Sequence, residues 1–187
     1  MQNKKNVIII GGGASGIMAA ISCKKHNPNY DVFILEKNFK LGRKILATGN
    51  GRCNILNKNL TPERFHTNSN LSLRKFIESV FDNFNENDMC NFFELQNLSL
   101  REESGDRIFP FINQSVAVVK ALEYELERLN IKIKYNTIVE KISKNNNNFF
   151  IKTNKQLFES DYVIIATGGL SYKNLGSTGD GYKFAKN

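Results

Sequence analysis

Cysteine and histidine are scarce in this sequence. The three cysteines (Cys23, Cys53 and Cys90) form no CxxC pair, and an odd number of thiols cannot all pair with one another. That pattern favours a reducing compartment. Only His26 and His66 could assist a cysteine in holding zinc, and neither stands at ligand spacing from one, so no metal site is expected.

Long apolar runs are also missing. The N-terminal "MQNKKNVIIIGGGASGIMAAI" has lysines followed by apolar residues, as a signal peptide does, but three consecutive glycines at 11–13 interrupt the run. No other segment approaches the length of a membrane-spanning helix. The sequence therefore predicts a cytoplasmic protein with no membrane contact.

Internal repeats and domain linkers are absent as well, so the 187 residues fit one domain or a domain cut from a larger protein. Acidic residues are the minority, 18 against 26 basic ones, which leaves a formal net charge of +8. This excess suits an anionic partner such as phosphate, nucleic acid or an acidic membrane surface. A solvated, lysine-rich surface explains it equally well.

Glycine, by contrast, is present in a pattern. The β-branched run Val7–Ile10 predicts a strand buried on both faces, and Gly11, Gly13 and Gly16 follow it as G-x-G-x-x-G before a helix over 17–25. In such a motif the first glycine makes the tight turn, the second lets a pyrophosphate approach the backbone, and the third allows close helix–strand packing. The N–H groups at the helix N-terminus attract phosphate.

A second strand, "DVFILEK" (31–37), contains Glu36 near its end, twenty residues after Gly16, where an acid can accept hydrogen bonds from an adenosine ribose. A glycine turn without a ligand and a surface glutamate are the alternative reading. Strand, glycines, helix, strand and acid in this order favour dinucleotide binding. No second G-x-G-x-x-G occurs, so a separate NAD(P)H domain is not expected.

The middle of the chain predicts helices over 72–82 and 87–95 and an amphipathic helix from about Ser115, preceded by a turn in "GDRIFP". Apolar residues at helical spacing are expected in the core: Leu73, Phe76, Ile77 and Val80 in the first helix, and Val116, Val119, Ala121, Leu122, Leu126 and Leu129 in the last.

Short strands follow, at 131–142, 149–153 and 156–160, the later ones antiparallel through polar turns at 145–148 and 154–155. Together these elements predict a Rossmann-type α/β fold with a parallel sheet, a helical insertion at about 58–104 and a β-meander crossover at about 137–160.

The last predicted strand, Tyr162–Ala166, leads into Thr167-Gly168-Gly169, at the sheet edge where open parallel sheets bind ligands. "GSTGDGY" (176–182) then predicts a flexible loop whose one acid, Asp180, is read either as a ligand or as a turn residue. The remaining unusual stretch, "LGRKILATGNGRCNILN" (41–57), is too broken for a helix and too polar for a buried strand.

Five segments, taken together and in order, resemble the YhiN/HI0933-like (BaiN-type) NAD(P)/FAD-dependent oxidoreductases. They are "GGGASGIMAA", "LEKN", "GRKILATGNGRCNILN", "GDRIFP" and "IIATGGLSYKNLGSTGDGY". The resemblance runs across the whole chain. It implies a glutathione-reductase-like FAD domain, with FAD as the cofactor and NAD(P)H as the electron donor.

The resemblance also implies roles for individual residues. Pyrophosphate would be held by Gly11, Gly13, Ala14, Ser15 and Gly16, and the ribose region by Glu36 and Lys37. The 41–57 segment would run along the cofactor: Gly42, Gly49 and Gly51 allow its approach, Arg43 and Lys44 offset phosphate charge, and Thr48 and Asn54 bond phosphate or flavin edges.

By the same resemblance, the backbone of Val139 would meet adenine, Thr167 and Gly168 would line the cofactor, and Asp180 would face the flavin or substrate. Tyr172 is a second candidate near the flavin, and no catalytic acid is assigned. Arg52 is read either as a cofactor contact or as the partner of a protein carboxylate. Cys53 is expected to be a packing residue, because no resolving cysteine stands near it.

The activity that the resemblance implies is reduction of a conjugated C=C bond, in ribosomal RNA uridine or in an enone small molecule. The basic charge favours RNA slightly. Family members continue past the Gly179-Asp180-Gly181 (GDG) element into a second domain and a C-terminal stretch over the flavin. This chain would then be an N-terminal part of such an enzyme, and the alternative is a non-catalytic dinucleotide-binding fragment or one half of a split flavoenzyme with a separately encoded second half.

Overall fold

The computed structural model describes residues 4–65 and 71–186, with side chains from Arg74 onward in the second stretch. The chain forms two compact units, which we describe separately. The first contains Met1–Leu46 and Leu122–Asn187, and the second contains Ala47–Ala121.

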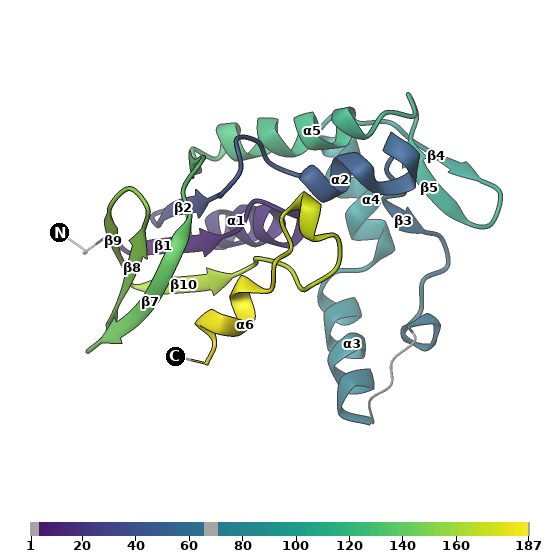
Figure 1. Ribbon diagram of the computed structural model, residues 1–187. Helices are drawn as coiled ribbons and strands as arrows, with labels where there is room; N and C mark the ends of the chain where they lie inside the picture. Colours follow the sequence, from purple (N-terminus) through teal and green to yellow (C-terminus); the bar gives the residue numbers. More distant parts are fainter. Residues whose placement is uncertain (1–3, 66–70, 187) are drawn as a thin grey trace. The chain divides into compact units, whose positions relative to one another are not determined.

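A four-stranded parallel sheet is the centre of the first unit (Figure 1). Its strand order is β10-β1-β2-β6, with bounds β1 (Asn6–Ile10), β2 (Asp31–Leu35), β6 (Lys132–Lys134) and β10 (Tyr162–Ile165). Ile9 lies level with Ile34 on one side and Ile164 on the other. The central strand β1 is a continuous apolar run because both faces of the sheet are covered.

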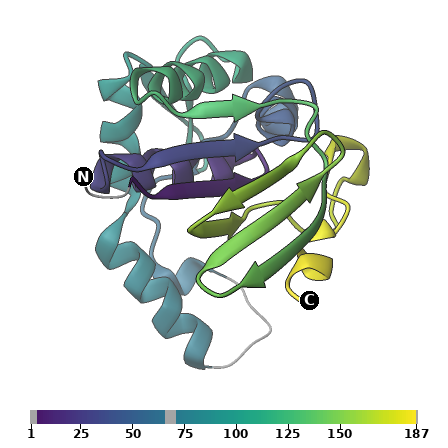
Figure 2. The same cartoon turned by 90° about the vertical axis from the view of Figure 1, so that its left-hand side faces the viewer.

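Helix α1 (Ala14–His26) packs along one face of this sheet, and an antiparallel meander covers the other (Figure 2). The meander consists of β7 (Val139–Asn145), β8 (Asn148–Thr153) and β9 (Leu157–Ser160). Ile151 of the meander is fully buried against Ile8, Ile10 and Leu35. Alternate residues of β1 therefore point to the meander and to α1, as the period of a strand requires.

Two short α-helices were not expected. Residues 41–57 are not wholly irregular, since α2 (Arg43–Ala47) begins there, with Leu46 N–H donating to Gly42 O at 2.9 Å. The loop expected around Asp180 is also partly helical, because α6 (Asp180–Phe184) starts at that residue. A single turn of helix is too short to produce a periodic sequence signal.

The second unit contains α3 (Leu71–Asn83), α4 (Glu86–Leu95) and an antiparallel sheet of order β3-β5-β4. Its strands are β3 (Leu56–Asn57), β4 (Leu100–Glu103) and β5 (Arg107–Pro110). The β5 segment was expected to be part of a turn, and this sheet was not predicted, because its strands are short and partly charged. Helix α4 begins with a capping box between Asn85 and Asp88.

Helix α5 (Ser115–Arg128) crosses from the second unit into the first. The expected burial of Val116 is wrong: its side chain is exposed, and Val118 is buried in its place beside Val119. Phe76 and Val80 of α3 are exposed too, contrary to expectation, while Leu73 lies outside the described side chains. Helical spacing identified the helices correctly but did not fix which face is covered.

None of the described helices is long and apolar enough to cross a membrane. Within the same described residues, no cluster of three or more His, Cys, Asp or Glu side chains could hold a metal ion.

Candidate dinucleotide site

The glycine loop joins β1 to α1, and different physical constraints act at each of its glycines. Gly11 has φ +106°, and a Cβ there would lie 2.5 Å from Ala166 O. A Cβ on Gly16 would lie 1.9 Å from Gly11 O, so only glycine lets the helix pack this closely. Gly13 has an ordinary φ of −84°, and a Cβ there would meet nothing within 4 Å. Backbone and packing thus require Gly11 and Gly16 but not Gly13.

Open space beside Gly13 coincides with the start of α1. Gly13 is the N-cap and supplies no side-chain cap, the first turn contains no acid, and Ala14 and Ser15 are exposed. The first N–H groups of a helix have no acceptor within the helix and carry its partial positive charge. This end of α1 is therefore an accessible site for an anion and fits a pyrophosphate.

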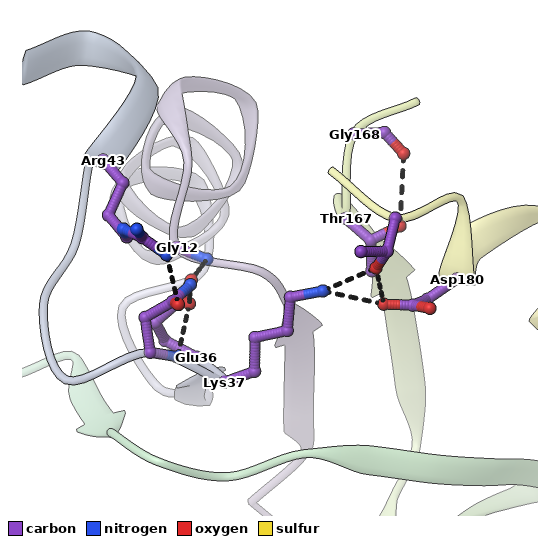
Figure 3. Close-up of polar contacts among 9 residues, drawn as sticks. Gly12, Glu36, Lys37, Arg43, Thr167, Gly168 and Asp180 are labelled. Atoms are coloured by element: carbon purple, nitrogen blue, oxygen red, sulfur yellow. Dashed lines mark hydrogen bonds and ion pairs between the residues drawn. The ribbon is translucent and has the colours of Figure 1, made fainter. Parts of the chain in front are cut away.

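Glu36 follows the last residue of β2 and is 6% exposed. Its Oε2 accepts from Gly12 N–H at 2.7 Å, and its Oε1 accepts from Asn38 N–H at 2.8 Å and from Asn38 Nδ2 at 2.6 Å. Figure 3 shows the carboxylate directed at the glycine loop. The acid expected to bind a ribose is thus brought against the loop expected to bind pyrophosphate.

Lys37 points toward the segment after β10. Its Nζ lies 2.7 Å from Thr178 Oγ1 and 2.9 Å from Asp180 Oδ2, and Thr178 also donates to Asp180 at 2.6 Å (Figure 3). Burial alone would raise the pKa of Asp180, but the hydrogen bonds from Thr178 and Lys37 outweigh it and hold that pKa below its ordinary value. Asp180 is therefore an ionised partner of Lys37.

Lys44 lies beside the turn after β10. A Cβ on Gly168 would come 3.3 Å from Lys44 Nζ and 2.7 Å from Ser177 Oγ, and Gly168 itself has φ +74°. Thr167 precedes it and approaches Gly168 O through its hydroxyl at 3.5 Å. The carboxyl end of β10 thus brings Thr167, Gly168 and a lysine together, as expected for a ligand edge.

Val139 begins β7, and its side chain packs against the buried cluster of Ile8, Ile10, Leu35 and Ile151. Two residues earlier, Thr137 N–H donates to Glu36 O at 2.9 Å, so this stretch runs past the end of β2. Tyr172, the other candidate, is 71% exposed and has φ +57°.

Thr48, Gly49 and Asn54 belong to the second unit. A Cβ on Gly49 would lie 2.9 Å from Asn54 N and 3.1 Å from Phe109, so packing within this unit requires that glycine. With its NH2 group turned toward β5, the Asn54 amide donates to Leu56 O at 2.9 Å and to Ile108 O at 3.1 Å. Both positions are thereby used in holding the loop against β5.

Arg52 pairs with Glu103 at 2.9 Å and lies over the Phe109 ring at 4.3 Å, which agrees with the carboxylate alternative for this arginine. Hydrogen bonds from Arg101 and then Arg52 hold the pKa of Glu103 below its ordinary value. Cys53 is buried, and burial raises the pKa of its thiol, as suits a packing residue.

Sequence reasoning missed Asn38, which supplies two of the three donors to Glu36. It also missed Ser177 and Thr178, which approach Gly168 and Asp180. A signal for Asn38 was present, since an amide two residues after a candidate ribose acid can hydrogen-bond back to it.

The profile described as the HI0933-like protein Rossmann domain matches residues 5–187. The chain belongs to the HI0933-like family. This confirms the resemblance of the five segments.

Two relatives illustrate the family. The chain is 39% identical over 178 residues to a 3-dehydro-bile acid delta(4,6)-reductase of Clostridium scindens, covering 95% of this chain and 42% of the relative. It is 28% identical over 183 residues to a ribosomal RNA dihydrouridine synthase of Haemophilus influenzae, covering 96% and 44%. The chain spans less than half the length of these curated relatives.

Solved structures show the same fold. Thermovibrio ammonificans THI4 superposes with a TM-score of 0.57 at 16% identity, over 88% of this chain and 56% of that one. CtdE, solved in complex with FAD, gives 0.50 at 19% identity, over 89% and 39%. The predicted α/β Rossmann-type FAD-binding fold, with its parallel sheet and meander, is confirmed.

Proposed function

We propose that the first unit binds the ADP half of FAD and serves an FAD-dependent reductase. Gly13 carries this proposal, because neither its backbone conformation nor its neighbours require glycine, whereas an approaching pyrophosphate would. The family and the relatives, named as reductase and dihydrouridine synthase, support it.

In this proposal the N–H groups of Gly13, Ala14, Ser15 and Gly16 hold the pyrophosphate, and Lys44 contributes positive charge. Glu36 accepts from a ribose hydroxyl through the one lone pair, on Oε2, that its three N–H donors leave available. Val139 borders adenine, and Thr167 and Gly168 line the cofactor's path. Lys37, Arg43 and Asp180 act by holding the segment after β10, and Thr48, Gly49 and Asn54 remain proposed for the flavin side.

Bound FAD would supply hydride transfer, with NAD(P)H as the proposed reductant. The chain's own contribution is to bind and orient: an anion site at α1, a ribose acceptor at Glu36 and a cation at Lys44. No catalytic acid is assigned among its residues.

The substrate that we propose is a molecule with a conjugated C=C bond, which the enzyme would reduce. The two relatives suggest different molecules of this kind. The higher identity to the bile acid reductase favours an enone small molecule. The net charge of +8 and the similarity to the dihydrouridine synthase favour a uridine in ribosomal RNA.

The proposal is tested by purifying the chain, adding FAD and measuring binding by visible absorbance and titration calorimetry. We expect protein-shifted flavin bands, with an affinity reduced at least about tenfold in Glu36→Ala, because hydrogen bonds to a charged group are lost. An unshifted spectrum and no heat of binding at high FAD would refute the proposal for this chain.

The alternative function is a non-catalytic dinucleotide-binding module or one half of a split flavoenzyme. FAD binding without NAD(P)H oxidation, followed by activity on adding a polypeptide that corresponds to the rest of the relatives, would identify the split enzyme.

A further inference from the structure

Asn38 occupies a central position in the hydrogen bonds around Glu36. Its backbone N–H and its Nδ2 both donate to Glu36 Oε1, at 2.8 and 2.6 Å. Gly12 N–H donates to the other carboxylate oxygen at 2.7 Å. Because Glu36 is 6% exposed, these protein donors replace water around its charge and fix the direction of its oxygens.

The acceptor side of the same amide points elsewhere. Asn38 Oδ1 accepts from Arg43 Nη1 at 2.7 Å, and Arg43 Nη2 donates to Asn174 O at 3.0 Å. A carboxamide can donate to a carboxylate and accept from a guanidinium at the same time, which neither a carboxylate nor an aliphatic side chain can do. The residue type is therefore matched to its two neighbours.

The segment that Arg43 reaches also packs on residues 37 and 38. A Cβ on Gly176 would lie 3.2 Å from Asn38 Nδ2 and 3.6 Å from Lys37 Cε. Lys37 itself bonds Thr178 and Asp180. Two separate tethers thus attach residues 174–180 to the end of β2.

We propose that Asn38 is a positioning residue, which orients Glu36 for the ribose and couples it through Arg43 to the segment 174–180. The inference rests on the proposed dinucleotide site. The ribose end of the site and the segment 174–180 are therefore coupled: loosening that segment weakens recognition of the ribose.

The decisive variant is Asn38→Asp, because it keeps the size and the Arg43 acceptor but removes the Nδ2 donor to Glu36. The probes are FAD, ADP and 2′,3′-dideoxy-ADP, titrated calorimetrically against the full chain. At about pH 8 we expect ADP to bind at least about tenfold more weakly to the variant, and its preference over dideoxy-ADP to disappear.

A pH series separates positioning from simple damage. Two adjacent carboxylates bind a shared proton more tightly than a single carboxylate binds its own. As the pH falls toward about 5.5, the introduced carboxyl group therefore becomes protonated, can donate to Glu36 again, and ADP affinity recovers. The wild type shows no such recovery. In a double-mutant cycle, Arg43→Gln lowers ADP affinity alone but adds little to Asn38→Ala, because that variant has already removed the oxygen to which Arg43 donates.

Lys40→Gln is the matched control: it removes an exposed cation from the same stretch and outside this network, and it leaves binding unchanged. Unchanged ADP affinity and ribose preference in a folded Asn38→Asp variant would overturn the inference while the dinucleotide site stands. Loss without recovery at lower pH would also overturn it. Wild-type protein that binds neither FAD nor ADP would overturn both.

Discussion

Gly13 and Gly16 lie in one motif, but glycine is needed at the two positions for different reasons. Gly16 is held by packing, since its Cβ would overlap Gly11 O at 1.9 Å, and that backbone atom cannot move without opening the β1–α1 turn. Gly13 faces open space in a conformation that any residue adopts. Stability and ligand binding can therefore be separated at these two positions.

We expect Gly16→Val to lower the free energy of unfolding by about 1–3 kcal/mol or more, the usual cost of overpacking. Gly13→Val should leave that free energy within about 0.5 kcal/mol and remove FAD binding. Urea unfolding and flavin titration of the two variants give the comparison. A Gly13→Val protein that unfolds like Gly16→Val would show that packing, not a ligand, explains Gly13.

At the scale of elements, an ion-pair group connects α1 to α5. Glu125 of α5 is completely buried and accepts from Lys25 of α1 at 2.9 Å and from Arg128 at 2.6 Å. The hydrogen bond from Arg128, followed by that from Lys25, holds the pKa of Glu125 below its ordinary 4.5. A buried carboxylate needs such compensation to remain charged.

This group predicts a dependence of stability on pH. A carboxyl group whose pKa is depressed in the folded state stabilises the fold above its unfolded value and loses that contribution as pH falls through the folded value. At neutral pH, Glu125→Gln should lower the free energy of unfolding by about 1–2 kcal/mol. The difference from wild type should shrink when urea unfolding is repeated at about pH 3.

Glu159→Gln provides the control for that series, because this carboxylate of the meander is exposed and accepts from the side chain of Asn148 at 2.6 Å. Its unfolding free energy should follow the wild type at both pH values. A constant difference between wild type and Glu125→Gln from neutral to acid pH would mean that the charge of Glu125 does not contribute.

At the scale of the whole molecule, the excess of basic residues bears on the choice of substrate. Several lysines have acidic neighbours, such as Lys37 with Asp180 and Lys58 with Glu102, yet the chain keeps a formal charge of +8. Attraction to RNA phosphates releases counterions and weakens steeply with salt, whereas binding of an apolar enone does not.

We expect affinity for a ribosomal RNA fragment to fall at least about tenfold between about 50 and 200 mM salt if RNA is the substrate. Filter binding with the uridine-containing fragment measures this, and an unrelated duplex of equal length reports non-specific attraction. Equal affinity for both RNAs, together with salt-insensitive binding of a steroid enone, would favour the small molecule.

Local sequence determined the elements with strong short-range signals. Val7–Ile10, the G-x-G-x-x-G turn and the strand before Glu36 were predictable because β-branched runs and glycines restrict the backbone wherever they occur. The order of these elements was enough to predict the fold, since a right-handed crossover leaves a β-α-β unit few arrangements. The acid and the glycines of the candidate site were predicted from the same motif.

Tertiary structure alone decided the contacts between residues far apart in the chain. Lys37 meets Asp180 and Arg43 meets the carbonyl of Asn174 because the carboxyl ends of parallel strands converge, although more than 130 residues separate each pair. The covered face of α5, with Val118 in place of Val116, likewise depends on what packs there. Periodicity predicts that a helix has an apolar face, but only the surrounding elements determine which side chains become buried.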